Sequence, residues 1–486
     1  MHTRYIGLAA SLLLAGPALA GGMDVGEHGA RATGRGGAFT AKADDPSAID
    51  NNPAGLAKQR GTHFYICGRV LYGPVEYRRA RTLDWSGVTE GGVPSLVDFE
   101  HTHNEAPWFP INGMIVAQSD FGLEDWTFAV GVYGPPGVGY VEYPGEGAQR
   151  FTLTEMEVTI LYYTAAAAWK YNDLFGLGLS LQWVDVPTLN FEMVTDGNVA
   201  PKLVNPVQSD FEINTRVEAA DRIGFTAIVG AWLKPIPQLE VAVAGRVIPV
   251  PVEAEGTLAL RALYLNLPDG IRTTRNGEPA DDVTFKMLLP PKLRAGVRYS
   301  HKDGKREVFD IELGVHYELW SLIDKYEMEM NIRSEVAGQI IDIGTIDIDK
   351  KWHDTIAVRL GGDYNVVPDW LTLRAGFFYE TGAEPKGYAY LDVMSLERIS
   401  PSAGFTLAHW GFELSAAYTY VWQKPMVVTE EESRVYQQMP AGQCKAPYTN
   451  PNLCHPEYIG KPAAPANAGT YISDYHIITF ALSYGF

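Results

Sequence analysis

The chain ends in residues 479–486, the stretch TFALSYGF, in which large apolar side chains alternate with small or polar ones. Successive side chains of a β-strand point to opposite faces. Phe480, Leu482, Tyr484 and Phe486 would therefore share one face, and the other face would carry only threonine, alanine, serine and glycine. The stretch predicts a strand with one apolar face that ends on an aromatic residue.

The same period of two recurs from about residue 60 onward. In residues 308–319, for example, Phe309 and Ile311 alternate with Asp310 and Glu312. Each such segment predicts a strand that is apolar on one face and polar on the other. About fourteen segments follow this pattern, at roughly 61–80, 108–118, 124–135, 156–170, 174–187, 222–233, 238–250, 283–300, 306–320, 353–364, 370–382, 399–409, 410–423 and 471–486.

The connections between these segments alternate between long and short. The long ones lie near 81–107, 136–155, 188–221, 251–282, 321–352, 383–398 and 424–470. The short ones include 119–123, 171–173, 234–237, 301–305 and 365–369. A soluble sandwich or propeller gives no reason for this alternation, whereas an outer-membrane barrel has short periplasmic turns and long external loops. We therefore expect an all-β fold, a transmembrane antiparallel β-barrel of about 14 strands.

The composition agrees with a barrel embedded in lipid. Aromatic residues make up 12% of the chain and the mean hydropathy is −0.09, as expected when only alternate residues face lipid. A formal net charge of −19 at pH 7 excludes nucleic acid as a natural partner. Arg4, the apolar run 6–15 and the small residues Ala18 and Ala20 indicate a signal peptide over residues 1–20. Beyond it no apolar run approaches the ~18 residues that a membrane helix needs.

Residues 21–60 precede the first strand of the predicted barrel (61–486) and do not alternate. In Asp45-Pro46 and in Asn52-Pro53, a residue that favours the helix N-cap precedes a proline suited to the first helical position. We expect short helical turns here, with the Asn52 side chain satisfying a free helix N–H. Two arrangements fit the segment, a periplasmic extension and a plug inside the lumen.

The run Gly36-Gly37-Ala38-Phe39, followed by Asn52-Pro53-Ala54-Gly55, resembles the N-terminal hatch of the FadL/TodX family of outer-membrane transporters. Later stretches at 289–299, 354–362 and 369–377 resemble barrel strands of that family. The resemblance implies a helical hatch inside the barrel and passive transport of hydrophobic small molecules, such as long-chain fatty acids or hydrocarbons. It implies no cofactor, and a place in the outer membrane of a Gram-negative bacterium. The hatch residues implied to act in gating are Asn52, Pro53, Ala54 and Gly55.

The resemblance also implies that substrate leaves sideways at a kink in the third strand. Gly134, Pro135 and Pro136 end that predicted strand, and two prolines remove two donors from the ladder. The residues therefore predict a local failure of pairing, where the family places its lateral exit. A plain end of the strand is the alternative interpretation.

Two further groups of side chains are candidates for contact with a substrate. Large apolar residues fall in the long connections, where exposed apolar patches mark interaction sites: Phe191, Met193, Leu258, Leu260, Leu263 and Tyr264. They predict a docking groove, unless the loops pack on each other or extend the strands. Arginines on polar strand faces predict either recognition of a carboxylate headgroup or ion pairs that hold the hatch: Arg294, Arg298, Arg359 and Arg374.

Other classes of function have less support. No nucleophile stands in a recognisable catalytic motif and no Cys/His spacing suggests a metal, so we expect neither an enzyme nor a metal site. Cys444 and Cys454 lie ten residues apart in the last long connection and predict a disulfide in an exported protein. The aromatic C-terminus resembles the element that the barrel assembly machinery reads, on a monomeric barrel surrounded by outer-membrane lipid. A general diffusion porin and an adhesive or structural barrel are the alternatives, although an open porin gives no reason for a plug-like segment.

Overall fold

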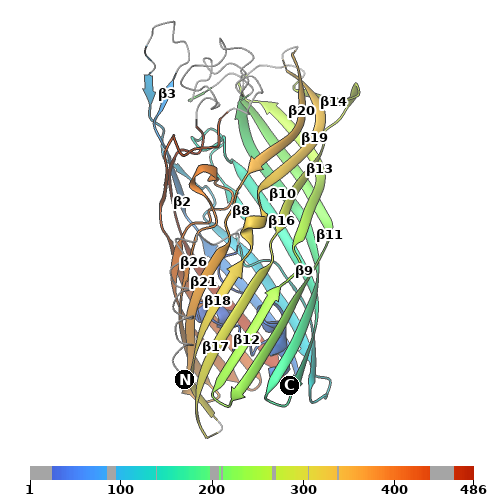
Figure 1. Ribbon diagram of the computed structural model, residues 1–486, viewed down its shortest axis with the longest axis vertical. Coiled ribbons are helices and arrows are strands. Elements are labelled where there is room, and N and C mark those ends of the chain that lie inside the picture. The colour runs from blue at the N-terminus through green and yellow to red at the C-terminus, as the bar shows by residue number, and fades with distance from the viewer. Residues whose placement is uncertain are drawn as a thin grey trace, which may run out of the picture.

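The computed structural model is a closed β-barrel with the N-terminal segment inside it (Figure 1). It describes residues 24–84, 93, 95–137, 139–196, 207–208, 212–264, 270–304, 306–336, 339–437 and 465–486. Fourteen antiparallel strands form the wall, and β1 closes it by pairing with both β6 and β26, which confirms the predicted fold. The wall strands are β1 (Thr62–Tyr72), β6 (Trp108–Ser119), β7 (Trp126–Tyr133), β9 (Glu155–Tyr171), β10 (Phe175–Asp196), β11 (Glu212–Ile236), β12 (Leu239–Arg246), β17 (Lys292–Asp303), β18 (Arg306–Glu318), β21 (Thr355–Val367), β22 (Leu371–Glu380), β23 (Arg398–His409), β24 (Phe412–Gln423) and β26 (Gly469–Gly485).

The alternating sequence pattern places apolar side chains outside and polar ones inside. On β18, Ile311 and Leu313 point outward and are about half exposed, whereas Asp310 and Glu312 point inward and are buried. Phe480 on β26 is likewise outward and 54% exposed. The outer face can therefore contact lipid along its whole girth, while the polar inner faces contact the segment inside the barrel.

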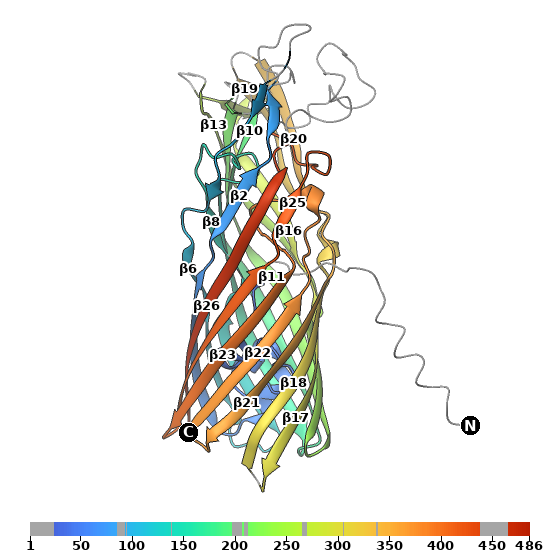
Figure 2. The same cartoon turned by 90° about the vertical axis from the view of Figure 1, so that its left-hand side faces the viewer.

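The wall continues into an additional sheet at the end opposite the C-terminus (Figure 2). β13 (Val250–Ala262) pairs with β11 and with β16 (Asp282–Leu289), and β16 pairs with β19 (Lys325–Val336). β19 in turn pairs with β20 (Gln339–Asp349). Strands extend beyond the lipid-facing band at this end of the barrel. The prediction of loops is therefore wrong over much of three long connections, 188–221, 251–282 and 321–352.

Two predicted strands are interrupted at prolines. The segment 61–80 divides into β1 and β2 (Val75–Arg79), and the segment 283–300 divides into β16 and β17. The breaks fall at Pro74 and at Pro290-Pro291, where a ladder donor is missing. The remaining short strands are β3 (Thr82–Asp84), β4 (Ser95–Val97), β5 (Thr102–His103), β8 (Tyr140–Glu142), β14 (Arg272–Arg275), β15 (Glu278–Pro279) and β25 (Met426–Val428).

The described N-terminal residues, 24–60, fold inside the lumen, in the half nearer the C-terminus (blue in Figure 1). They form α1 (Ala30–Gly34), α2 (Ala48–Asn51) and the 3₁₀-helix η1 (Pro53–Lys58), and nearly all of them are buried. We call this segment the hatch. The other 3₁₀-helices in the described ranges are η3 (Trp320–Leu322) and η4 (Lys386–Tyr388). Within the described ranges, every helix is too short or too polar to span a bilayer.

Candidate functional site

The last turn of the hatch begins at Asn52, as the sequence predicts. The buried Asn52 side chain accepts a hydrogen bond from Ala54 N at 3.2 Å, and Pro53 takes the first position of η1, so the predicted cap is confirmed. Asn52 Nδ2 also donates to Thr40 O at 2.9 Å. From the wall, Trp232 Nε1 donates to Ala54 O at 2.9 Å. η1 is thus fixed both to the rest of the hatch and to the barrel.

Two of the predicted arginines bind the hatch directly. Arg294 Nη2 lies 2.7 Å from a Glu27 carboxylate oxygen and 3.3 Å from Asp50 Oδ2. Arg359 Nη1 donates to Gly36 O at 3.2 Å. All these side chains are buried, and such charge-assisted hydrogen bonds are stronger than neutral ones. The two arginines therefore clamp the hatch at separate points.

The other two predicted arginines bind carboxylates of the wall. Arg298 Nη2 lies 3.2 Å from Asp310 Oδ2, and Arg374 Nε lies 3.2 Å from Asp363 Oδ1. The same two carboxylates bind Arg35 of the hatch, whose Nη1 lies 2.7 Å from each. The geometry matches the second sequence interpretation, in which lumenal charges pair with each other and hold the hatch.

The sequence interpretation missed the hatch cations that complete this network. Arg35 has a fully buried guanidinium, and Lys42 Nζ lies 2.8 Å from Asp310 Oδ2. Glu312 accepts hydrogen bonds from the backbone N–H groups of Ala41 and Lys42 at 2.8 and 2.9 Å. The signal available in the sequence was the presence of basic residues in a segment otherwise rich in glycine and alanine.

Glycines in the wall let the hatch backbone press directly on the strands. A Cβ on Gly376 of β22 would lie 2.0 Å from the carbonyl carbon of Arg35, and one on Gly178 of β10 would lie 2.1 Å from Ala54 N. No side chain fits at such distances. Glycine is a weak strand residue unless another backbone approaches closely, which is the case at both positions.

The third wall strand, β7, stops pairing with its neighbours at Tyr133. The chain then turns into the lumen. Val25 N donates to Pro136 O at 2.8 Å, and Gly137 forms an isolated β-bridge with Asp24. Pairing with β9 resumes only at β8. The predicted break at Gly134-Pro135-Pro136 is therefore an inward bend that ends on the first described residues of the hatch.

The inward bend leaves two wall strands without a ladder between them. β6 pairs with β7 only from Met114 to Ser119, although it pairs with β1 up to Trp108. β9 pairs with β7 up to Tyr162 and with β8 from Glu157. The wall thus has a local gap in its hydrogen bonding beside the bend.

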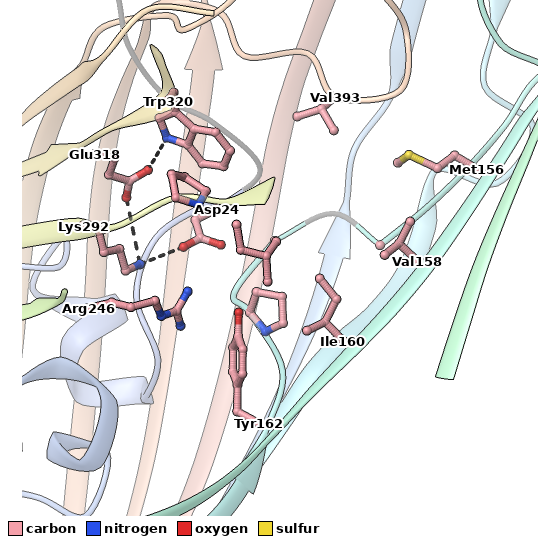
Figure 3. A pocket seen from close by; sticks show the side chains of 15 residues that line it. Asp24, Met156, Val158, Ile160, Tyr162, Arg246, Lys292, Glu318, Trp320 and Val393 are labelled. Atoms are coloured by element: carbon pink, nitrogen blue, oxygen red, sulfur yellow. Dashed lines mark hydrogen bonds and ion pairs between the residues drawn. The ribbon is translucent and has the colours of Figure 1, made fainter. Parts of the chain in front are cut away.

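A small cavity lies inside the wall beside this gap (Figure 3). Its volume is about 50 Å³, which is room for a few water molecules. Lys292 Nζ bridges Asp24 at 2.7 Å and Glu318 at 3.9 Å on one side of the cavity. Apolar side chains line the opposite side: Met156, Val158 and Ile160. The cavity therefore joins the hatch, the bend and an apolar part of the wall.

Most of the chain matches one known protein family. A model of the family described as "Outer membrane protein transport protein (OMPP1/FadL/TodX)" matches residues 11–449. The chain belongs to this family. It is therefore a transport channel of the Gram-negative outer membrane and not an enzyme.

Solved structures share the FadL/TodX fold at low sequence identity. A FadL homologue of Pseudomonas aeruginosa is 15% identical, with a TM-score of 0.70 over 96% of this chain and 100% of that one. The toluene transporter TodX of Pseudomonas putida is 13% identical, with a TM-score of 0.61 over 95% and 98%. The toluene transporter TbuX of Ralstonia pickettii is 16% identical, with a TM-score of 0.59 over 95% and 98%. The search of curated proteins found no match.

The apolar residues predicted to form a docking groove lie inside the FadL/TodX barrel at its outer end. Phe191 on β10 and Leu258 on β13 are buried, and the Phe191 ring lies 5.9 Å from that of Phe285. Their placement in water-exposed loops is therefore wrong, because β10 and β13 extend through these positions. Met193, Leu260 and Leu263 pack against the same core. Tyr264 is half-buried. Whether they contact a substrate stays a prediction.

The cysteine prediction concerns a part of the chain that the structure does not describe. Cys444 and Cys454 both lie outside the described residues, so their disulfide stays a prediction. Cys67 lies on β1, buried and with a free thiol. The signal peptide predicted over residues 1–20 also lies outside the described ranges.

Residues 381–397, between β22 and β23, fold back into the outer end of the barrel, and we call them the strap. Burial raises the pKa of the Glu384 carboxyl to about 8, although the Lys350 ammonium acts in the opposite direction. Asp392 also raises this pKa, and the phenols of Tyr326 and Tyr390 face the same carboxyl.

The raised pKa predicts that closure of the strap depends on pH. In an open strap Glu384 would titrate near its ordinary value of about 4.3. Between that value and about 8 only the closed strap keeps the proton, so closure weakens as pH rises through this window. Hydrogen-exchange protection of the strap, corrected for intrinsic rates, should fall from pH 5 to pH 8 (roughly the interval between these values). In Glu384→Gln the protection should not vary over this range, and a wild-type slope in that variant would refute the assignment.

Proposed function

We propose that this barrel carries hydrophobic small molecules, such as long-chain fatty acids or hydrocarbons, passively across the outer membrane. The hatch would gate the path, and the gap beside β7 would let substrate leave sideways into lipid. The observation that carries the proposal is the inward bend after Tyr133, which ties the gap in the wall to the hatch through Val25 and Pro136. Similar folds include two toluene transporters and a monoaromatic hydrocarbon channel.

The surroundings of the gap support exit into lipid. Unpaired backbone groups are costly where they face lipid, so a gap in the wall calls for a compensating role. Next to it, the rings of Tyr163 and Trp183 lie 4.9 Å apart on the outer face, as in the aromatic belts at a membrane interface. Val130 and Val132 are exposed just below the bend. A molecule leaving there would first meet these exposed apolar side chains.

The polarity of the path supports an apolar cargo. The lumenal arginines are engaged by hatch and wall carboxylates, which leaves them poorly placed to select polar solutes. Apolar side chains line the outer interior and one side of the cavity. Because the cavity holds only a few waters, substrate would have to displace protein groups as it passes. A general diffusion porin would need no such displacement.

Restoring the ladder across the bend tests the lateral exit. In Pro135→Val/Pro136→Thr the third strand regains two ladder donors, so β7 should continue beside β9 and close the gap. Uptake of a labelled long-chain fatty acid or of toluene should slow by about tenfold, which is a barrier higher by about 1.4 kcal/mol. Single-turnover uptake into cells or proteoliposomes would measure this rate.

A matched control uses two exposed prolines where β11 meets the turn to β12, Pro235 near the end of β11 and Pro237 in the turn. Pro235→Val/Pro237→Thr should leave uptake unaltered, because this turn lies away from the gap. Both variants should show wild-type heat modifiability, which reports a folded barrel. Equal uptake by the two double variants would refute exit beside β7 while leaving passive transport open to another route.

A further inference from the structure

The strap is a loop whose central residues are as buried as those of the hydrophobic core. Residues 389–396 are buried without interruption, although none of them belongs to a strand or helix. Val393 and Leu391 are 5% and 1% exposed. Connecting segments normally run over the surface, because burial leaves their backbone groups hard to satisfy. A loop that enters the path of a channel therefore calls for a specific reason.

The strap divides the space above the hatch. Val393 lines the cavity beside the gap, of about 50 Å³ (Figure 3). It also lines a second cavity of about 30 Å³. The second cavity is bounded by Tyr143 of the chain after β8, by Tyr475 of β26 and by Leu391 and Met394 of the strap. Only the strap residue Val393 is shared by the two linings. The linings also take neighbouring residues from the hatch, Asp24 and Val25, so the two cavities lie side by side with Val393 between them.

One buried ion pair holds the strap to the outer sheet. Lys350, directly after β20, is fully buried and its Nζ lies 2.6 Å from Asp392 Oδ2 of the strap. Aromatic rings surround the ammonium, with Nζ 4.2 Å from the ring centroid of Tyr390, 4.8 Å from that of Tyr326 and 5.7 Å from that of Trp352. Cation–π attraction is strongest where water is excluded, as it is here. We call Lys350 and Asp392 the catch.

Some buried polar atoms around the catch lack hydrogen-bond partners in the described part of the chain. Four buried polar atoms around it have no hydrogen-bond partner among the described residues: Tyr326 OH, Trp352 Nε1, Glu384 Oε2 and Asp392 Oδ1. Buried groups of this kind oppose the closed arrangement, since water would satisfy them if the strap opened. The ion pair with its rings is one of several links that hold the strap closed, beside hydrogen bonds from Asn467 Nδ2 to Ala389 O at 3.1 Å and from the Tyr143 hydroxyl to Leu391 O at 3.3 Å.

The ends of the strap are anchored in a way that suits a hinge. Glu380 and Arg398 are paired residues at the ends of β22 and β23, and their side chains form an ion pair. Inside the strap, Ala383 N donates to Ser395 Oγ at 3.0 Å, and Tyr390 N donates to Glu384 Oε1 at 2.7 Å. The strap is thus fixed at its base and internally bonded, so that it can move as one unit.

We propose that the strap is a lid inside the transport path and that the Lys350–Asp392 pair is its catch. Release of the catch joins the two cavities into one chamber for an elongated apolar ligand, such as an acyl chain. Only the nature of the ligand rests on the proposed transport function. The closed position of the strap follows from the burial and contacts of this chain alone, and its opening is the step that we propose.

Amide hydrogen exchange of the full-length barrel in bilayers tests the catch. Lys350→Met leaves Asp392 as a buried carboxylate without its cation, so exchange of residues 389–396 should accelerate by about tenfold or more. Asp392→Asn keeps the side-chain shape and should accelerate exchange in the same direction. Lys350→Met/Asp392→Leu replaces both charges by apolar groups, which stabilises the closed strap, so exchange should be slower than in wild type. The control is Lys351→Met, since Lys351 is half-exposed and pairs with Asp324 at 2.7 Å.

The outcomes separate the lid from the transport function. Equal exchange of residues 389–396 in the Lys350→Met and Lys351→Met barrels, with both folded by heat modifiability, would overturn the catch. The double variant, locked shut, should take up a fluorescent long-chain fatty acid several-fold more slowly than wild type. Wild-type uptake by a double variant whose strap stays protected would overturn the lid. If wild type itself takes up no fatty acid, the transport proposal fails while the exchange result still stands.

Discussion

Deleting residues 21–57 should convert the closed barrel into a water-filled pore. The described part of this segment occupies the lumen, and its removal exposes polar inner faces that water can hydrate. The wall should survive, because β1 pairs with β26 over ten residue pairs that do not involve the hatch. Planar-bilayer recording should therefore change from no current to a current of small ions that is interrupted whenever the strap closes the outer end.

A milder variant distinguishes gating from simple blocking. Asn52→Ala/Pro53→Ala removes the cap of η1, at a cost of about 1 kcal/mol, and should slow uptake of a hydrophobic substrate without opening a steady pore. Its barrel should assemble to the wild-type level. If the deletion leaves both conductance and uptake unaltered, these residues are not a gate, and the transport proposal loses its main mechanical support.

Substituting one wall glycine should dislodge the hatch without touching any charge. In Gly376→Ala the new Cβ would meet the Arg35 carbonyl carbon at 2.0 Å and the Gly36 nitrogen at 2.2 Å. Backbone on both sides of this contact cannot rotate away, so the hatch has to shift. Overpacking of this kind costs about 1–3 kcal/mol. Amides of the hatch should exchange faster, and transient openings should appear in single-channel records.

Gly68→Ala is the matched control for this substitution. Gly68 also lies within a wall strand, β1, but a Cβ there meets nothing within 4 Å. That variant should therefore keep wild-type hatch exchange and conductance. Equal behaviour of the two alanine variants would mean that the hatch does not rest on Gly376, and the tight contact between hatch and wall would have to be abandoned.

The strands that cross the membrane were predictable because each of their residues faces either lipid or lumen. The contrast is sharp in β18, where Ile311 follows Asp310. The contrast between the two faces of a strand weakens beyond the lipid-facing band, where the outer face of the sheet contacts water instead of lipid. The register of β10 against β9 also shifts between Asp185 and Thr188, which breaks the period of two. Phe191 therefore fell in a predicted loop although β10 continues through it.

The site divides in the same way between local and distant information. The Asn52 cap was predictable because its partner, Ala54, lies two residues away. The ion pairs of Arg35 with Asp310 and Asp363 were not predictable, since they depend on the register between neighbouring wall strands. The inward fold of the strap was equally hidden. A run of apolar residues such as Leu391 and Val393 fits a surface loop that binds something as well as a loop that turns inside.

The seam between β1 and β26 sets the order in which this molecule can be made. His63 lies opposite Gly485, so the first strand waits for the last residues of the chain before it gains its second neighbour. Pairing between such distant segments is slow, and the apolar outer face stays uncovered meanwhile. A chain that lacks β26 loses the partner with which β1 closes this barrel. Only a chain that contains both β1 and β26 can form this seam. A fragment without one of them keeps open strand edges, which chaperones and proteases recognise.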